Sequence, residues 1–189
     1  LEMARVFYKH RDKLKRSLRI CIWPGHSTGR YAGSTWFADT FGLDLDAHCV
    51  AQVNCDSPGC RWATSYEFSE WMSEVDELCK GAIMDTVRQP SKGSRPSRAG
   101  DYSFNNIGIT SFYMLSSSMP EELLKEKGYY PVGGCGGNIE WHTEDDMLHV
   151  ADLDILLKDI KIYTATILRV LNATVLPYNF RNTVDELIE

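Results

Sequence analysis

The sequence predicts an α/β domain in which helices pack in layers against a largely parallel sheet. Residues 18–22, 48–56 and 107–115 are alternating or continuous apolar segments, which is typical of strands. Residues 68–83 and 152–171 place their apolar side chains at helical spacing, which predicts amphipathic helices. Strands that alternate with helices favour a parallel sheet with helical layers.

Length and composition fit one soluble domain spanning residues 1–189. The net charge of −6 gives no reason to expect a nucleic-acid partner. The sequence contains no run of 18 apolar residues, so it predicts no membrane span. A cytoplasmic location is favoured, although the compartment and a homo-oligomeric state stay open. We expect the six cysteines to be buried free thiols, with a bridge between Cys55 and Cys60 as the alternative.

The first segment has a helical apolar face but no capping residue before it. Leu1, Ala4, Phe7 and Leu14 share this face. We therefore expect the chain to begin inside a helix and to be a piece of a longer protein. The strand at 18–22 then runs into a turn at Pro24.

Capping signals predict where the next helices begin. Ser34 is a candidate N-cap for a helix through Phe41. Thr64 and Glu67 form a candidate capping box for a helix that ends near Ile83. Residues 89–100 are rich in Ser, Gly, Pro and Arg, which predicts a mobile surface loop.

Polar residues gather where the predicted strands end or begin. His26 follows the first strand, Asp56 ends the second, Asp101 precedes the third, and His142 lies in the loop after it. Ligands of such sheets bind at the edge formed by the carboxyl ends of the strands. These four residues therefore define a candidate site.

Residues 25–29 read GHSTG, which matches the G-x-S-x-G nucleophile elbow of serine hydrolases. In that interpretation Ser27 is the nucleophile, Asp56 or Asp101 the acid and His142 the base. However, an oxyanion loop would have to follow an earlier strand, and the sequence shows no strand before residue 18. A Ser27 hydrolase stays as an alternative.

Four motifs occur in order along the chain, and the first of them contains GHSTG. They read WPGHSTGRYAGSTW, VNCDSPG, AGDYSFNNIGIT and WHTEDDMLHV, and begin at residues 23, 53, 99 and 141. Together they resemble the di-zinc aminopeptidase family that also includes glutamate carboxypeptidase and the transferrin receptor. The resemblance implies a three-layer α/β/α sandwich with a mostly parallel, mixed sheet, the phosphorylase/hydrolase-like zinc exopeptidase fold, truncated at the N-terminus.

The resemblance also implies roles for single residues. Asp56 matches a ligand of one zinc ion, His142 matches a ligand of the other, and Asp101 matches a supporting turn residue. Carboxylate and neutral imidazole are ordinary zinc ligands. Asp56 capping a turn and His142 bonding a buried carbonyl are the structural alternatives.

The chain departs from the family where the family has a Glu-Glu pair, because His26 and Ser27 stand there. The first Glu is the family's general base and the second a zinc ligand. Either His26 serves as base or ligand, or the site is degenerate and the fold binds a partner without catalysis.

Arg30 and Tyr31 lengthen the same turn by one residue. Arg30 is a candidate for binding a substrate carboxylate, with a surface position as the alternative.

The resemblance implies a zinc-dependent hydrolase of peptide or small amide bonds. It places the remaining zinc ligands in an N-terminal half outside this chain, so we expect the chain alone to be inactive. The alternatives are a non-catalytic binding domain on the same fold and the Ser27 hydrolase.

Overall fold

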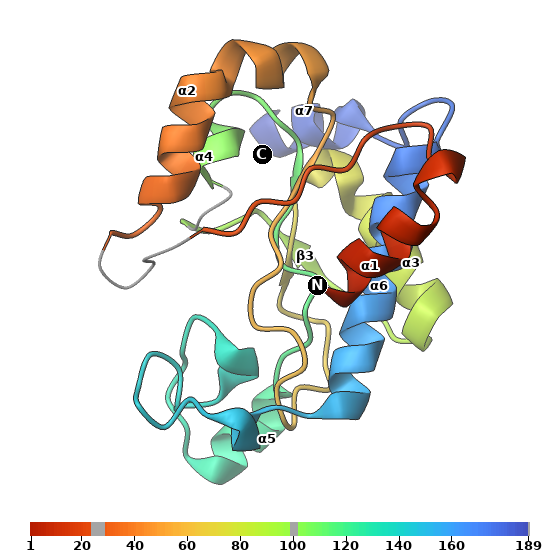
Figure 1. Ribbon diagram of the computed structural model, residues 1–189. Coiled ribbons are helices and arrows are strands. Elements are labelled where there is room, and N and C mark those ends of the chain that lie inside the picture. Colours follow the sequence, from red (N-terminus) through yellow and green to blue (C-terminus); the bar gives the residue numbers. More distant parts are fainter. Residues whose placement is uncertain (24–28, 99–101, 189) are drawn as a thin grey trace.

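Helices dominate the computed structural model, which describes residues 1–23, 29–98 and 102–188 (Figure 1). The helices are α1 (Glu2–Lys9), α2 (Ala32–His48), α3 (Asp76–Val87), α4 (Tyr102–Asn105), α5 (Glu121–Lys127), α6 (Leu153–Asn172) and α7 (Phe180–Ile188). Short 3-10 turns lie at η1 (Arg11–Lys13), η2 (Ser73–Val75), η3 (Cys135–Gly137) and η4 (Leu148–Val150). The strands are β1 (Gln52–Val53), β2 (Ser69–Glu70), β3 (Gly93–Ser94) and β4 (Ser111–Phe112).

The strands form two small parallel sheets, β1 with β4 and β2 with β3. Residues 65–72 run antiparallel to residues 111–118, with bridges from Glu70 to Met114 and from Ser65 to Ser118. The carbonyl of Thr110 accepts from Gln52 N, whereas that of Ser111 accepts from Met72 N. Because consecutive carbonyls of an extended chain point to opposite sides, the segment after Thr110 lies between its two partners.

Apolar clusters lie on both sides of these extended segments. One cluster joins α3 and α6 to the strands and includes Cys79, Ile83, Phe112, Leu115 and Ile162. A second cluster joins α2 and α4 and includes Ala38, Leu45, Phe104 and Ile109. In Figure 1, α2 and α4 lie on one side of the extended segments and α3 and α6 on the other. The α/β character and parallel pairing are thus confirmed, but the strands are too short to confirm a three-layer sandwich in detail.

The predicted strand at 18–22 is wrong for the described residues, because this segment has no strand assignment. Leu18, Ile20 and Ile22 are 36%, 56% and 80% exposed. No described segment pairs with them as a strand, so the alternation of side chains alone does not make a strand.

The helix predicted from Thr64 begins instead at Asp76. Residues 65–72 are extended because their backbone pairs with residues 111–118, which overrides the local capping pattern. Several of the predicted apolar positions are core positions, since Trp71, Val75 and Cys79 are buried, whereas Phe68 is 51% exposed.

Other predicted boundaries also shift. Ser34 lies inside α2, where its hydroxyl donates to Tyr31 O at 3.0 Å, and is not the N-cap. The segments predicted as strands at 48–56 and 107–115 contain only β1 and β4. The predicted surface loop at 89–100 contains β3, and Ser97 N donates to Glu70 at 2.9 Å.

The last long helix is confirmed to within one residue at each end, with Asp152 as its N-cap. Within the described ranges, no helix is both long and apolar enough to cross a membrane.

Candidate functional site

Three of the predicted site residues, His26, Ser27 and Asp101, lie outside the described residues. Their predicted roles stay predictions. The described candidates are Asp56, His142, Arg30 and Tyr31.

Asp56 lies on an exposed turn after β1, where the parallel pairing with β4 ends. Its backbone carbonyl accepts from the Ser116 hydroxyl at 2.8 Å. Its side-chain Oδ1 accepts from the Ser57 hydroxyl at 3.1 Å. Ser57 has a φ of 48° and Gly59 a φ of 75°, so the turn is tight. The backbone of the turn is therefore anchored while the Asp56 carboxylate faces solvent.

His142 lies on an exposed loop in the left-handed backbone region, with a φ of 61°. Its ring stacks on Trp141, with 4.0 Å between the ring centroids. The ring is held by an apolar neighbour that itself packs against the buried cluster of Cys60, Ala63 and Cys135.

Gly134 brings the Asp56 turn and the His142 loop together. A Cβ atom built on Gly134 would lie 2.5 Å from Trp141 Nε1 and 3.2 Å from Ser57 Oγ. The residue before His142 and the residue after Asp56 thus contact the same glycine. The structure places the two predicted zinc ligands on adjoining loops, although 86 positions separate them in the sequence.

A polar network that the sequence did not indicate joins the His142 loop to the segment after the Asp56 turn. Glu140 forms an ion pair with Arg61, whose Nε donates to Asn138 Oδ1 at 3.1 Å. The buried Asn138 amide donates in turn to Arg61 O at 3.1 Å and Cys135 O at 2.8 Å. Because Arg61 follows the Asp56 turn and Glu140 precedes His142, the network joins both loops a second time.

Arg30 and Tyr31 lie at the start of α2. Arg30 is exposed, and the Tyr31 hydroxyl donates to Arg98 O at 2.9 Å. Tyr31 also adopts a φ of 61° as the residue before α2. This hydrogen bond joins the segment that follows residues 24–28 to the segment that precedes residues 99–101.

Asp159 is a fully buried carboxylate of α6 that the sequence analysis did not identify. Burial raises its pKa, and hydrogen bonds from Gly59, Tyr66 and Ser117 oppose that shift. Helical spacing could have identified it, because Asp159 shares the inward face of α6 with Ile155, Ile162 and Tyr163.

The cysteines, all within the described residues, are free thiols, so the alternative Cys55–Cys60 bridge is wrong. Cys60, Cys79 and Cys135 are buried as expected, whereas Cys21 and Cys55 are exposed. Burial raises the pKa of the Cys60 thiol to about 11, which keeps it protonated near neutral pH.

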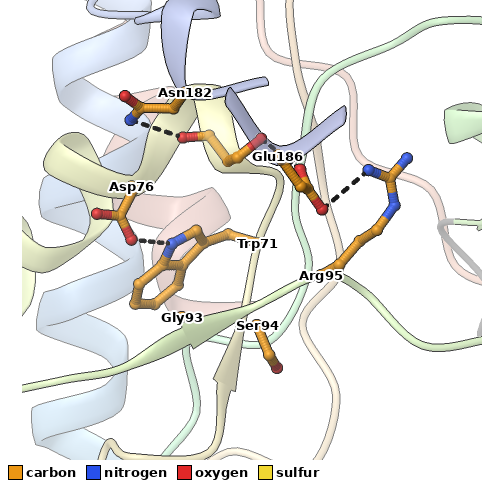
Figure 2. Close-up of a pocket in the computed structure, with 8 residues that line it drawn as sticks. Trp71, Asp76, Gly93, Ser94, Arg95, Asn182 and Glu186 are labelled. Carbon is orange, nitrogen blue, oxygen red and sulfur yellow. Dashed lines mark hydrogen bonds and ion pairs between the residues drawn. The ribbon is translucent and has the colours of Figure 1, made fainter. Parts of the chain in front are cut away.

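A separate pocket of about 280 Å³ lies between β3 and α7 (Figure 2). Figure 2 shows that its polar groups pair with one another: Trp71 Nε1 donates to Asp76 at 3.0 Å and Arg95 to Glu186 at 3.2 Å. Neither Asp56 nor His142 lines this pocket. The Arg95–Glu186 pair attaches α7 to the segment after β3, and the Trp71–Asp76 hydrogen bond joins the segment after β2 to the start of α3.

The described donors fit a zinc ion in kind, since Asp56 offers carboxylate oxygen and His142 imidazole nitrogen. Within residues 1–23, 29–98 and 102–188, however, no group of three or more His, Cys, Asp or Glu side chains could hold a metal ion. A zinc site here would therefore take further ligands from outside these ranges.

A solved zinc aminopeptidase, a second aminopeptidase and a third solved protein share this fold. The Bacillus subtilis zinc aminopeptidase BSAP matches with a TM-score of 0.63 and 16% identity, over 81% of this chain and 36% of that chain. The aminopeptidase from Aneurinibacillus sp. strain AM-1 matches with a TM-score of 0.56 and 14% identity, over 77% of this chain and 32% of that chain. LapA from Legionella gives a TM-score of 0.57 at 14% identity, over 76% of this chain and 37% of that chain.

The chain thus spans about a third of the length of these proteins, and at such identities the likeness shows the fold alone. No protein-family model matches the chain, and no curated protein matches it.

Proposed function

We propose that the chain forms part of an aminopeptidase-like zinc hydrolase that cleaves peptide or amino-acid amide bonds. The carrying observation is the contact of Ser57 and Trp141 with Gly134, which brings the Asp56 turn beside the His142 loop. Both residues match zinc ligands in the family that the sequence resembles. The shared fold with BSAP, a zinc aminopeptidase, supports the same function.

In this proposal Asp56 donates a carboxylate oxygen to one zinc ion and His142 an imidazole nitrogen to the other. The remaining ligands come from residues outside the described ranges. Zinc in such hydrolases polarises the carbonyl group of the substrate. His26 stands where the family has its catalytic glutamate and would take up a proton from the attacking water, since imidazole is a base near neutral pH.

The test is zinc binding by the intact protein, measured by elemental analysis and by competition with a chromophoric chelator. We expect bound zinc, and we expect His142→Ala and Asp56→Ala to weaken it. The loss should exceed the roughly 10- to 100-fold that removal of an outer-shell partner costs. His10→Ala and Asp46→Ala are matched controls, because both residues are exposed and lie on α1's end and on α2.

Hydrolysis of aminoacyl anilides, with and without chelator, tests the activity itself. An intact protein that binds no zinc at neutral or mildly alkaline pH would contradict the proposal. Zinc-independent labelling of Ser27 by a fluorophosphonate would favour the serine hydrolase instead. Zinc binding without hydrolysis would favour a binding domain on this fold.

A further inference from the structure

The Asp159 carboxyl group accepts hydrogen bonds from four donors among the described residues. Its Oδ2 accepts from Gly59 N at 2.8 Å and from the Ser117 hydroxyl at 3.1 Å. Its Oδ1 accepts from the Tyr66 hydroxyl at 3.0 Å and from Ser117 N at 3.1 Å. A carboxylate has about four acceptor positions, so the described donors fill all of them. A fully buried carboxyl group is tolerated only when it is hydrogen-bonded in this way.

Tyr163 makes a second contact one helical turn further along α6. Its oxygen accepts from Leu115 N at 3.1 Å and lies 3.1 Å from Ser116 Oγ. Since the single Ser116 hydroxyl proton goes to Asp56 O at 2.8 Å, the Tyr163 proton goes to Ser116 Oγ. A directed chain of hydrogen bonds therefore runs from α6 to the Asp56 carbonyl.

The two contacts hold the Asp56 turn at both ends. Tyr163, through Ser116, fixes the Asp56 carbonyl, and Asp159 fixes the Gly59 amide. Between them, Gly59 lies so close to α6 that a Cβ there would be 2.4 Å from Leu156 Cβ. The positive φ of Ser57 costs roughly 1–3 kcal/mol, and such strain persists only where the surroundings impose the conformation.

We propose that Asp159 is a positioning residue for Asp56. It holds the turn of residues 56–59 against α6, so that the Asp56 carboxylate is carried on a fixed backbone in the turn that adjoins the His142 loop. This inference rests on the proposed zinc function, and it assigns a role to a buried side chain that contacts neither metal nor substrate. Outer-shell groups of this kind orient metal ligands without touching the metal.

The main test is Asp159→Asn in the intact protein. Asparagine has nearly the same shape as aspartate, but its NH₂ group is a hydrogen-bond donor. That group would face donors that hydrogen-bond to the carboxylate in the wild type. We expect the Gly59 and Ser117 amides to exchange hydrogen faster and zinc affinity to fall about 10- to 100-fold, with Asp56 unchanged. Asp154→Asn is the matched control, because Asp154 is an exposed carboxylate on the same helix.

Two milder variants keep the test decisive if Asp159→Asn fails to fold. Ser117→Ala and Tyr66→Phe each remove one hydroxyl donor to Asp159. Both should accelerate Gly59 exchange and weaken zinc binding, by less than Asp159→Asn. Ser118→Ala is the control for Ser117→Ala, because the Ser118 hydroxyl makes only a 3.5 Å contact with Ser65 O.

The outcomes separate this inference from the function on which it rests. If the wild type binds zinc through Asp56 and these variants lower stability without weakening zinc binding, Asp159 is only structural and the inference is overturned. If Gly59 exchange is unchanged in all three variants, the inference is also overturned. If the wild type binds no zinc, the proposed function fails first and the inference fails with it.

Discussion

At the scale of single residues, Gly134 determines how closely the two candidate loops approach. Its φ of −168° is extended backbone that any residue adopts, so the requirement is for space alone. The indole of Trp141 occupies the position that a side chain would take. Gly134 is therefore a residue of the candidate site, although it carries no functional group.

Gly134→Ala should displace Trp141 and, with it, the stacked His142 ring. The added methyl would lie 2.5 Å from Trp141 Nε1, and overpacking of this kind costs about 1–3 kcal/mol in free energy of unfolding. Urea denaturation measures the loss, and the indole N–H resonance of Trp141 reports the displacement.

The matched control is Gly42→Ala, since no atom lies within 4 Å of a Cβ built on Gly42 in α2. That change should stabilise the protein by about 0.5–1 kcal/mol. An unshifted Trp141 resonance in Gly134→Ala would show that Gly134 does not set the approach of the loops.

At the scale of elements, α6 links the core to the candidate site. Ile162 and Tyr163 are fully buried on one face of the helix, and Asp159 on the same face reaches the Asp56 turn. The N-terminal end of α6 contacts the same turn, because Asp152 N donates to Gly59 O at 2.8 Å. The position of α6 therefore determines that of the Asp56 turn.

Asp152→Ala should destabilise α6 by about 1 kcal/mol. The Asp152 side chain accepts from Ile155 N at 3.0 Å, which satisfies one of the amides left free at a helix start. Thermal or urea unfolding measures the effect. Asp152→Asn keeps a capping oxygen and should retain most of the stability, whereas an equal loss in both variants would show that the cap is not the cause.

The elements differ in how well the sequence predicts them, and the reason is the distance to their partners. The periodicity of α6 and its capping Asp152 are local signals, so both ends of the helix were predicted within one residue. Residues 65–72 pair with residues 111–118, which lie 39 to 53 positions further along the chain. The pattern of one segment contains no information on such a partner. The predicted helix therefore began too far toward the N-terminus.

At the scale of the whole molecule, the sequence predicts which loops meet better than it predicts how they are held. Asp56 and His142 were expected at one edge, and the structure places their loops against Gly134. Arg61 and Glu140 were not predicted, because each acts through a partner distant in sequence. Asp159 was missed, although its helical spacing with Ile155 and Ile162 could have identified it. The roles of Asp56 and His142 as ligands stay predictions until zinc binding is measured.

The hydroxyls of two buried tyrosines and one half-buried tyrosine lead us to expect a loss of stability at alkaline pH. Burial raises the pKa of Tyr66, Tyr163 and Tyr178 above the ordinary value near 10. In the unfolded chain these groups lose their protons near pH 10, while in the folded protein they keep them. Because the folded state binds more protons, the free energy of unfolding falls as pH rises above about 10.

Each such tyrosine contributes up to about 1.4 kcal/mol per pH unit to that decline until its folded-state pKa is reached. Urea denaturation between pH 8 and 11 measures the slope, and tyrosinate absorbance at high pH should lag until the protein unfolds. Tyr178→Phe should lower the stability at neutral pH, since it removes a 2.7 Å hydrogen bond to Val50 O, yet make the alkaline slope shallower. Tyr130→Phe, at an exposed position, is the matched control. A free energy of unfolding that stays constant from pH 9 to 11 would contradict the burial of these hydroxyls.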